Sequence, residues 1–159
     1  MYKRQTLLDV NNDTLSKIKE SYPSVNIAES SKSVIESILP KVDIIVGAVL
    51  TPGGKPPTVI TKEMLKLMEP KTILSDVSVD QGGCFETSKP TTHDKPTYLV
   101  DDIIHYCVKN IPSAVPFTAT NALNEATRPF ILKFANSGLN GMFNAVSYTH
   151  LTLPTTPYV

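Results

Sequence analysis

The sequence predicts an α/β fold in which a doubly wound parallel sheet is followed by a long C-terminal helix. Short apolar runs alternate with helical patterns from residue 7 to residue 80, as in such sheets with right-handed crossovers. Residues 43–50 are almost all apolar and rich in β-branched side chains, as in a parallel strand that helices cover on both faces. Residues 118–136 have the pattern of one long helix.

The predicted strands are separated by helices that begin at short polar side chains. The strands cover residues 7–10, 25–28, 43–49 and 72–79. Asn12 or Asp13 is expected to cap the first helix and Ser30 or Ser31 the second, because their oxygens accept hydrogen bonds from free N–H groups of the first turn. Thr61 is expected to cap a third helix, which a proline ends. All four strands are expected to lie parallel in one sheet.

The second half of the chain is predicted to contain shorter strands and the long helix. Residues 51–57 hold two glycines and three prolines and are expected to form a loop. Further short strands are expected over residues 96–108, and residues 112–116 are expected to form an extended connector. The helix over residues 118–136 contains Pro129, where we expect a kink.

The composition indicates one globular domain without a strong charge. The chain has 159 residues, 41% of them hydrophobic, and its 15 basic residues balance 15 acidic ones. No net field attracts it to phosphate backbones or anionic lipid, so nucleic acid and membranes are not expected partners. The longest apolar run, residues 44–50, is shorter than the roughly 20 residues of a membrane span, and no signal peptide is evident, so we expect a cytoplasmic protein. Its two cysteines are expected to be reduced.

Loops at the carboxyl ends of the predicted strands are the expected ligand site, because ligands of doubly wound sheets bind beyond this edge. The loops follow Val10, Ala28, Leu50 and Val79. The last loop begins with Asp80 and contains two adjacent glycines, whose backbone a flat ring can approach closely.

Four segments of the sequence resemble alanine dehydrogenase, and the resemblance extends over almost all of residues 6–145. The segments are IVGAVLTPG at 45–53, DQGGCFETS at 80–88, PTTHD at 90–94 and HYCVKNIP at 105–112. The resemblance implies a Rossmann-like NAD-binding domain, truncated at its N-terminus, from an enzyme that reversibly converts L-alanine to pyruvate and ammonia with NAD. It also implies a cytoplasmic homo-oligomer, a hexamer in this family.

Two other functions stay open beside this one. An α-type subunit of a nicotinamide nucleotide transhydrogenase would share the fold, although its glycine-pair loop normally differs from Asp-Gln-Gly-Gly-Cys-Phe-Glu. A stand-alone nucleotide-binding module is the third possibility. The glycine-rich turn expected upstream of Leu7, and the substrate domain, are missing from the sequence, so this fragment alone is expected to be inactive.

The two ends of the chain are expected not to belong to the fold. One DNA adapter, of the kind used in transposase-made sequencing libraries, encodes the first five residues in one direction and Val-Ser-Tyr-Thr at 146–149 in the other. A natural Thr/Pro-rich tail over 149–159 is the alternative. The expected organisation is adapter-encoded residues 1–5, a partial dinucleotide-binding domain over 6–117, a helix over 118–145 leading back to the substrate domain, and adapter-encoded residues 146–159.

The resemblance assigns residues at three predicted strand ends to the NAD site. Asp9 is implied to bind the ribose hydroxyls, which favours NAD over NADP, whereas its alternative role is to cap the next helix. Ser30 is implied to lie near the adenine, with a helix cap as the alternative. Val49 and Leu50 are implied to line the cofactor cleft, although the residues alone suggest core positions.

Asp80 is the expected catalytic residue. Hydride transfer from alanine to the nicotinamide needs a group that manages protons while water adds to the imine, and a carboxylate beside the ring suits this task. The resemblance pairs it with a histidine of the substrate domain, whereas its alternative role is to open a glycine turn. The remaining residues assigned to the cofactor site are Val77, Ser78, Val79, Lys89, Val108, Lys109, Asn110 and Ile111.

No metal site is predicted. Cys84, His93, His105 and Cys107 carry suitable atoms, but their spacing matches no common zinc site. His93 and Asp94 could form a proton relay, whereas the prolines around them favour a turn held by side-chain hydrogen bonds. Cys107 lies in an apolar segment, so we expect an inert thiol.

Overall fold

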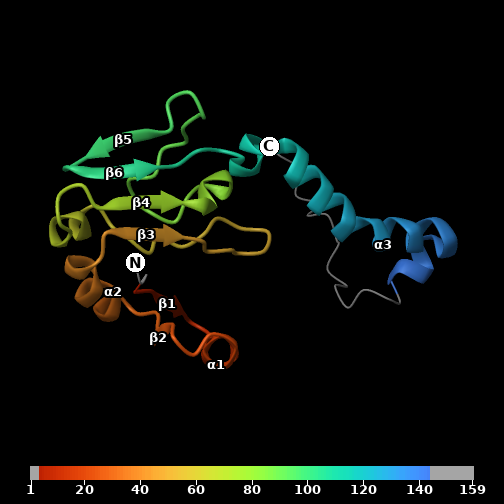
Figure 1. The fold of residues 1–159 in the computed structure, drawn as a ribbon, viewed down its shortest axis with the longest axis horizontal. Helices are drawn as coiled ribbons and strands as arrows, with labels where there is room; N and C mark the ends of the chain where they lie inside the picture. Colours follow the sequence, from red (N-terminus) through yellow and green to blue (C-terminus); the bar gives the residue numbers. More distant parts are fainter. Residues whose placement is uncertain (1–3, 144–159) are drawn as a thin grey trace, which may run out of the picture. The chain divides into compact units, whose positions relative to one another are not determined.

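The structure is a computed structural model that describes residues 4–143, and it divides into two units, Met1–Ile111 and Pro112–Val159. Short strands and helices alternate in the first unit, and one long helix forms most of the described part of the second (Figure 1). The elements of the first unit are β1 (Thr6–Asp9), α1 (Asn12–Ser21), β2 (Asn26–Glu29), α2 (Lys32–Ile38), β3 (Ile44–Gly47), β4 (Ile73–Asp76), β5 (Thr97–Val100) and β6 (Ile103–Tyr106). The predicted α/β class and the long C-terminal helix are confirmed.

The strands of the first unit form two sheets. In one sheet β1 and β2 pair in parallel, with Asp9 opposite Glu29. The other has the order β3-β4-β6-β5, in which the first three strands are parallel and β5 is antiparallel to β6 (Figure 1). The prediction of one sheet for the first four strands is therefore wrong. In the usual order of a doubly wound sheet a further strand separates these two groups, and none lies between them in residues 4–143.

The cap of α1 is the residue before the predicted ones, and the cap of α2 is one of the two predicted serines. Asn11, rather than Asn12 or Asp13, caps α1, because its Oδ1 accepts hydrogen bonds from the N–H groups of Asp13 and Thr14 at 2.9 and 3.2 Å. Ser31 caps α2, and its Oγ accepts a hydrogen bond from the N–H of Val34. One of the two serines proposed for this position is thus confirmed.

Three predicted segments are 3₁₀ helices instead. Glu63–Leu67 replaces the expected third helix, and Val77–Gln81 replaces the end of the fourth strand. The latter change occurs because the carboxylate of Asp76 caps the turn at the N–H of Ser78. Ile111–Ala114 is also a 3₁₀ helix, where we expected an extended connector.

One face of the larger sheet is open to solvent. The register places Ile44, Ile73, Ile104 and Leu99 in one row across β3, β4, β6 and β5. Ile44 is 58% exposed and Leu99 is 66% exposed. The apolar run in β3 predicts cover on both faces, but the described helices of the first unit bury only one.

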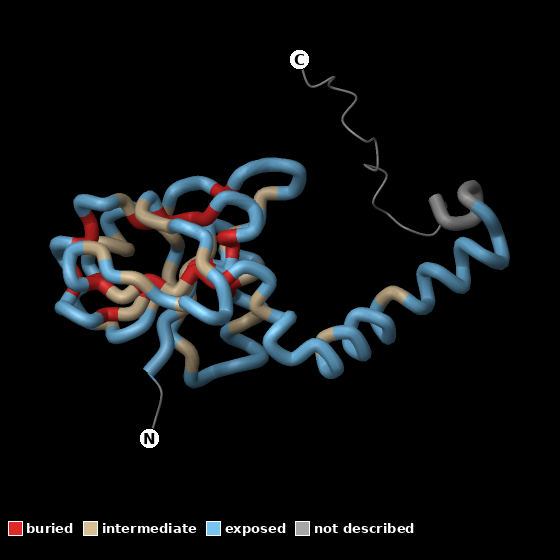
Figure 2. Tube along the Cα trace, turned by 90° about the horizontal axis from the view of Figure 1, so that it is seen from above, coloured by how far each residue is buried: buried red, intermediate tan, exposed pale blue. Residues whose placement is uncertain are grey.

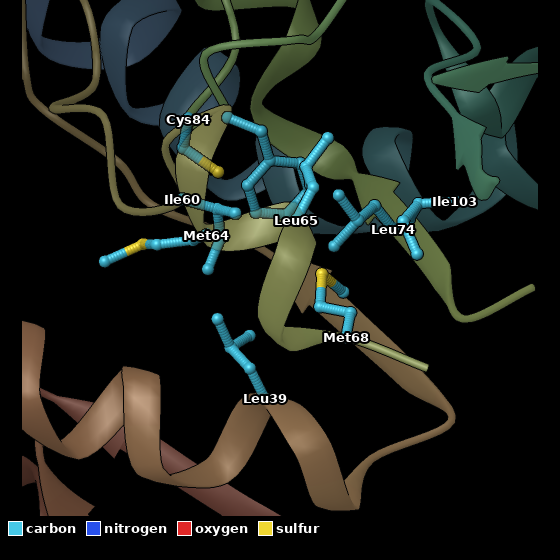
Figure 3. Close-up of a cluster of buried hydrophobic side chains, with 9 residues drawn as sticks. Leu39, Ile60, Met64, Leu65, Met68, Leu74, Cys84 and Ile103 are labelled. Carbon is cyan, nitrogen blue, oxygen red and sulfur yellow. The ribbon is translucent and has the colours of Figure 1, made fainter. Parts of the chain in front are cut away.

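The core lies on the opposite face of this sheet. Leu74 of β4 is fully buried there, and burial of such a side chain contributes about 1.5–3 kcal/mol. Figure 3 shows Leu39, at the end of α2, pointing toward the side chains of the Glu63–Leu67 segment. The buried side chains of this core are Leu39, Ile60, Met64, Leu65, Met68, Leu74, Cys84, Phe85 and Ile103.

The second unit contains α3 (Pro116–Phe143). Helical dihedral angles are interrupted at Gly138, where φ is 64°, rather than at Pro129 as expected. None of its side chains up to residue 138 is buried, as the pale blue colour in Figure 2 shows. Within residues 4–143, no helix combines the length and hydropathy of a membrane span.

The prediction about the two ends stays a prediction, because residues 1–3 and 144–159 lie outside the described part of the chain. Gln5, the last residue of the predicted adapter-encoded segment at the N-terminus, lies within the described part. Its carbonyl oxygen accepts a hydrogen bond from the N–H of Asn26 at 3.0 Å, which extends the pairing of β1 and β2.

Candidate functional site

Asp9 and Ser30 lie together at the carboxyl end of the β1–β2 pair. The N–H of Ser30 donates a hydrogen bond to the backbone oxygen of Asp9 at 2.8 Å. The side-chain Oδ1 of Asp9 accepts a hydrogen bond from the N–H of Asn11 at 2.7 Å, so this carboxylate also stabilises the start of the turn before α1. Asp9 thus takes part in the turn that begins the next helix, which is close to the capping role that the sequence offers as its alternative. It also lies at the end of its strand, as predicted.

The loop after β3 forms a hollow with the turn after β4. The hollow has a volume of about 420 Å³ and is lined by residues 50–55 together with Gln81. Leu50 is exposed at its wall, whereas Val49 is half-buried and its carbonyl oxygen accepts a hydrogen bond from the Oγ of Ser78 at 2.8 Å. The predicted site residues of these two strand ends are therefore adjacent.

Asp80 is exposed in the turn Val77–Gln81, directly beyond β4. Its Oδ2 accepts a hydrogen bond from the N–H of Asn110 at 3.1 Å, although the two residues are 30 positions apart. Asn110 has a φ of 50°, in the left-handed region that asparagine tolerates. The structure thus brings the predicted catalytic residue next to Asn110, one of the residues assigned to the cofactor site.

The two glycines after Asp80 both have positive φ, 107° at Gly82 and 77° at Gly83. The stem of Lys55 packs over Gly82, and a Cβ there would lie 3.2 Å from its Cε. The glycines allow the chain to turn back beneath the exposed carboxylate of Asp80. An exposed carboxylate on a tightly held turn can accept or release a proton from a molecule that lies beside it.

A second polar network holds the segment that contains Lys89. The Tyr98 hydroxyl donates a hydrogen bond to the backbone oxygen of Thr87 at 2.8 Å and accepts one from the N–H of Lys89 at 2.6 Å. Burial raises the pKa of Tyr98 well above its usual value, so the hydroxyl stays protonated. The ring of Tyr98 stacks on His105, with 5.0 Å between ring centroids.

His105 is fully buried in this network. Its Nδ1 donates a hydrogen bond to the backbone oxygen of Ile103 at 3.0 Å, and its Nε2 lies 2.7 Å from the Oγ1 of Thr87, which donates to it when the ring is neutral. Burial lowers the pKa of His105 accordingly. We therefore assign His105 a structural role.

The other residues assigned from the sequence differ in how far their side chains are exposed. The side chains of Val79 and Val108 are buried, so only their backbone atoms face a ligand. Val77, Lys89 and Lys109 are exposed, and Ile111 is half-buried. Within the described residues no three His, Cys, Asp or Glu side chains are arranged to hold a metal ion, and both cysteines are buried free thiols.

Asp76 and Ser88 are not among the residues that the sequence predicts for the site. Asp76, the last residue of β4, is fully buried and hydrogen-bonded to Ser88, Ser78 and the N–H of Cys84. Burial, together with the nearby charge of Asp76, raises the pKa of Cys84 to about 12. The available signal was Asp76 as the charged residue of the predicted strand over residues 72–79, because a buried carboxylate requires partners.

The chain matches known proteins over most of its length. The family model described as "Alanine dehydrogenase/PNT, C-terminal domain" matches residues 1–153. The alanine dehydrogenase of Halomonas elongata is 46% identical over 134 residues, which are 84% of this chain and 36% of that protein. The alanine dehydrogenase of Staphylococcus haemolyticus is 42% identical over 142 residues, 88% of this chain and 38% of the relative. The chain thus spans little more than a third of these relatives.

Solved structures agree with these matches. A structure of L-alanine dehydrogenase superposes with a TM-score of 0.78 and 40% identity, over 87% of this chain and 38% of that one. A transhydrogenase from Sinorhizobium meliloti superposes with a TM-score of 0.61 and 22% identity, over 72% of this chain and 32% of that one, which shows a shared fold. The chain therefore belongs to the alanine dehydrogenase/PNT family, to the part described as its C-terminal domain.

Proposed function

We propose that the chain is the NAD-binding part of an alanine dehydrogenase that converts L-alanine, water and oxidised NAD to pyruvate, ammonium, NADH and a proton. The observation that carries this proposal is Asp80, an exposed carboxylate on a glycine turn beyond a parallel strand, held by the N–H of Asn110. The relatives named alanine dehydrogenase, at up to 46% identity, support the same substrates.

The residues present fit a dinucleotide along the carboxyl ends of the strands. Asp9 and Ser30 stand at the end of β1 and β2, where such folds bind the adenosine ribose. Leu50 and Gln81 line a hollow beside the glycine turn, where the backbone is close to the surface. When bound, NAD supplies the acceptor for the hydride that leaves the substrate carbon.

In this proposal Asp80 takes and returns protons at its exposed carboxylate oxygens during alanine turnover. Asn110 orients that carboxylate through its backbone N–H, and the exposed neighbour Lys109 adds positive charge at the same turn. Val77, Ser78 and Val79 belong to the site because they form the start of the 3₁₀ turn Val77–Gln81, which carries Asp80. Lys89, Val108 and Ile111 are assigned to the site by the family resemblance alone.

The family resemblance also supports a cytoplasmic homo-oligomer, a hexamer, that acts in alanine catabolism. An α-type transhydrogenase subunit is the second candidate, because a transhydrogenase shares the fold. At 22% identity, against 40% for the L-alanine dehydrogenase, that likeness favours the dehydrogenase.

The proposal is tested in a full-length background. The segment that this chain matches in the Halomonas elongata alanine dehydrogenase is replaced by the corresponding residues of this chain, and oxidation of L-alanine is followed by NADH absorbance. We expect an active chimera. Asp80→Asn keeps the side-chain volume but removes the base, so turnover should fall by about 10²-fold or more while NADH still binds.

Asp9→Ala provides the matched comparison, because Asp9 is assigned to the ribose rather than to the reacting centre. We expect weaker NADH binding with turnover largely kept at saturation. A folded chimera that binds NADH without oxidising alanine, or an Asp80→Asn variant with normal turnover at saturating alanine, would show that the proposal is wrong.

A further inference from the structure

Asp76 is a fully buried carboxylate with four hydrogen-bond donors around it. Its Oδ1 accepts the N–H of Ser78 at 2.9 Å and lies 3.5 Å from the Sγ of Cys84. Its Oδ2 accepts the N–H of Cys84 at 2.9 Å and the hydroxyl of Ser88. Four donors match the lone pairs of a carboxylate, which offsets the cost of burying this side chain.

The partners of Asp76 enclose the turn that carries Asp80. Ser78 lies two residues before Asp80, Cys84 lies four residues after it, and Asp80 itself is exposed between them. The backbone also leaves room for the carboxylate, because a Cβ on Gly83 would lie 2.8 Å from the Oδ2 of Asp76. The glycine therefore allows the contact in addition to the turn.

We propose that Asp76 is a positioning residue for Asp80. Its carboxylate ties both ends of the 77–84 segment to the end of β4 and thereby presents Asp80 to the N–H of Asn110. The consequence for catalysis rests on the proposed function above, whereas the positioning itself does not.

An asparagine at this position cannot replace the carboxylate. One of its two terminal atoms would be an amide nitrogen, which faces a backbone N–H of Ser78 or of Cys84 whichever way the amide is turned. One backbone donor therefore loses its acceptor, and the turn that holds Asp80 moves.

The experiment measures amide hydrogen exchange and the proton chemical shift of Asn110 by NMR in the 159-residue chain. In Asp76→Asn we expect the exchange rate of the Asn110 amide to rise by about tenfold, because its hydrogen bond to the charged carboxylate of Asp80 is weakened or lost. The amide resonance of Asn110 should shift toward its position in Asp80→Ala, where this acceptor is absent. Amides of the β1–β2 pair should be unchanged. Asp43→Asn, the same chemical change in an exposed residue before β3, is the control and should leave Asn110 as it is.

Ser88→Ala keeps the test decisive if Asp76→Asn does not fold, because it removes only one donor to Asp76. It should raise exchange at Asn110 by a smaller factor. In the chimera, Asp76→Asn should lower kcat for alanine oxidation while the KM for NAD changes little. An inactive parent chimera would contradict the proposed function and leave the NMR result standing. Unchanged exchange and chemical shift of Asn110 in a folded Asp76→Asn chain would refute the positioning role. If Asp76→Asn does not fold, the same unchanged values in Ser88→Ala would refute it.

Discussion

Gly47, the last residue of β3, lies against the core with no room for a side chain. A Cβ at this position would clash with the Sγ of Cys84 and would lie 2.6 Å from the Cζ of Phe85. Carbon atoms in contact are normally about 3.5–4.0 Å apart, so Gly47→Ala forces the core or the strand to move. The φ of Gly47 is not positive, so the effect is one of packing alone.

The expected cost follows from two opposing contributions. Overpacking of a tight core costs about 1–3 kcal/mol. Replacing glycine by alanine also restricts the unfolded chain, which contributes about 0.4–1 kcal/mol in the other direction. We therefore expect Gly47→Ala to lower the free energy of unfolding by about 1.3 kcal/mol, the difference of the two mid-range values, and by at most about 2.6 kcal/mol.

Urea unfolding of the 159-residue chain, followed by far-UV circular dichroism, measures this change. Gly54→Ala is the matched control, because it restricts the unfolded chain in the same way, whereas its Cβ would lie 3.3 Å from Thr51 Cγ2 in an exposed loop. We expect the free energy of unfolding to stay the same or to rise by up to about 1 kcal/mol. Cys84→Ala removes the nearest atom, so Gly47→Ala should cost about 1 kcal/mol less in that background. Equal costs for the two alanine variants would refute the packing argument.

Three further predictions rest on burial and exposure. Cys84, with a pKa of about 12, should resist iodoacetamide at about pH 8 in the native chain and react once urea unfolds it; rapid native labelling would contradict its burial. Because the pKa of His105 is lowered in the fold, the unfolded chain binds more protons, and stability should fall as the pH drops below about 6.5, by at most about 1.4 kcal/mol per unit. Urea midpoints at about pH 7.5 and 5.5 measure this, and His105→Gln should flatten the slope. Leu99→Lys and Ile44→Lys should each reduce binding of a hydrophobic dye to the open sheet face. Neither should lower the free energy of unfolding by more than about 0.5 kcal/mol, and unchanged dye binding would show that this face is covered.

Local chemistry determined much of what the sequence predicts correctly. Apolar runs predicted the strands, and their alternation with helices predicted the parallel pairing of β1 with β2 and of β3 with β4, because such an alternation allows few connections. The Asp-Gln-Gly-Gly loop identified the turn with Asp80, because adjacent glycines indicate positive φ independently of the rest of the fold. The family resemblance rested on these same short segments.

Only the tertiary structure decided how the segments combine. The separation of β1 and β2 from β3 depends on which strands are present to pair, and no periodicity reports that. The contact of Asp80 with Asn110 and the contacts of Asp76 with Ser88 join residues far apart in the chain, so no local propensity contains them. Asp76 looked like a strand residue, and it ends the strand because burial forces its carboxylate to find donors in the next turn. Periodicity reports which side chains are apolar, whereas the partners of a buried charge depend on the path of the whole chain.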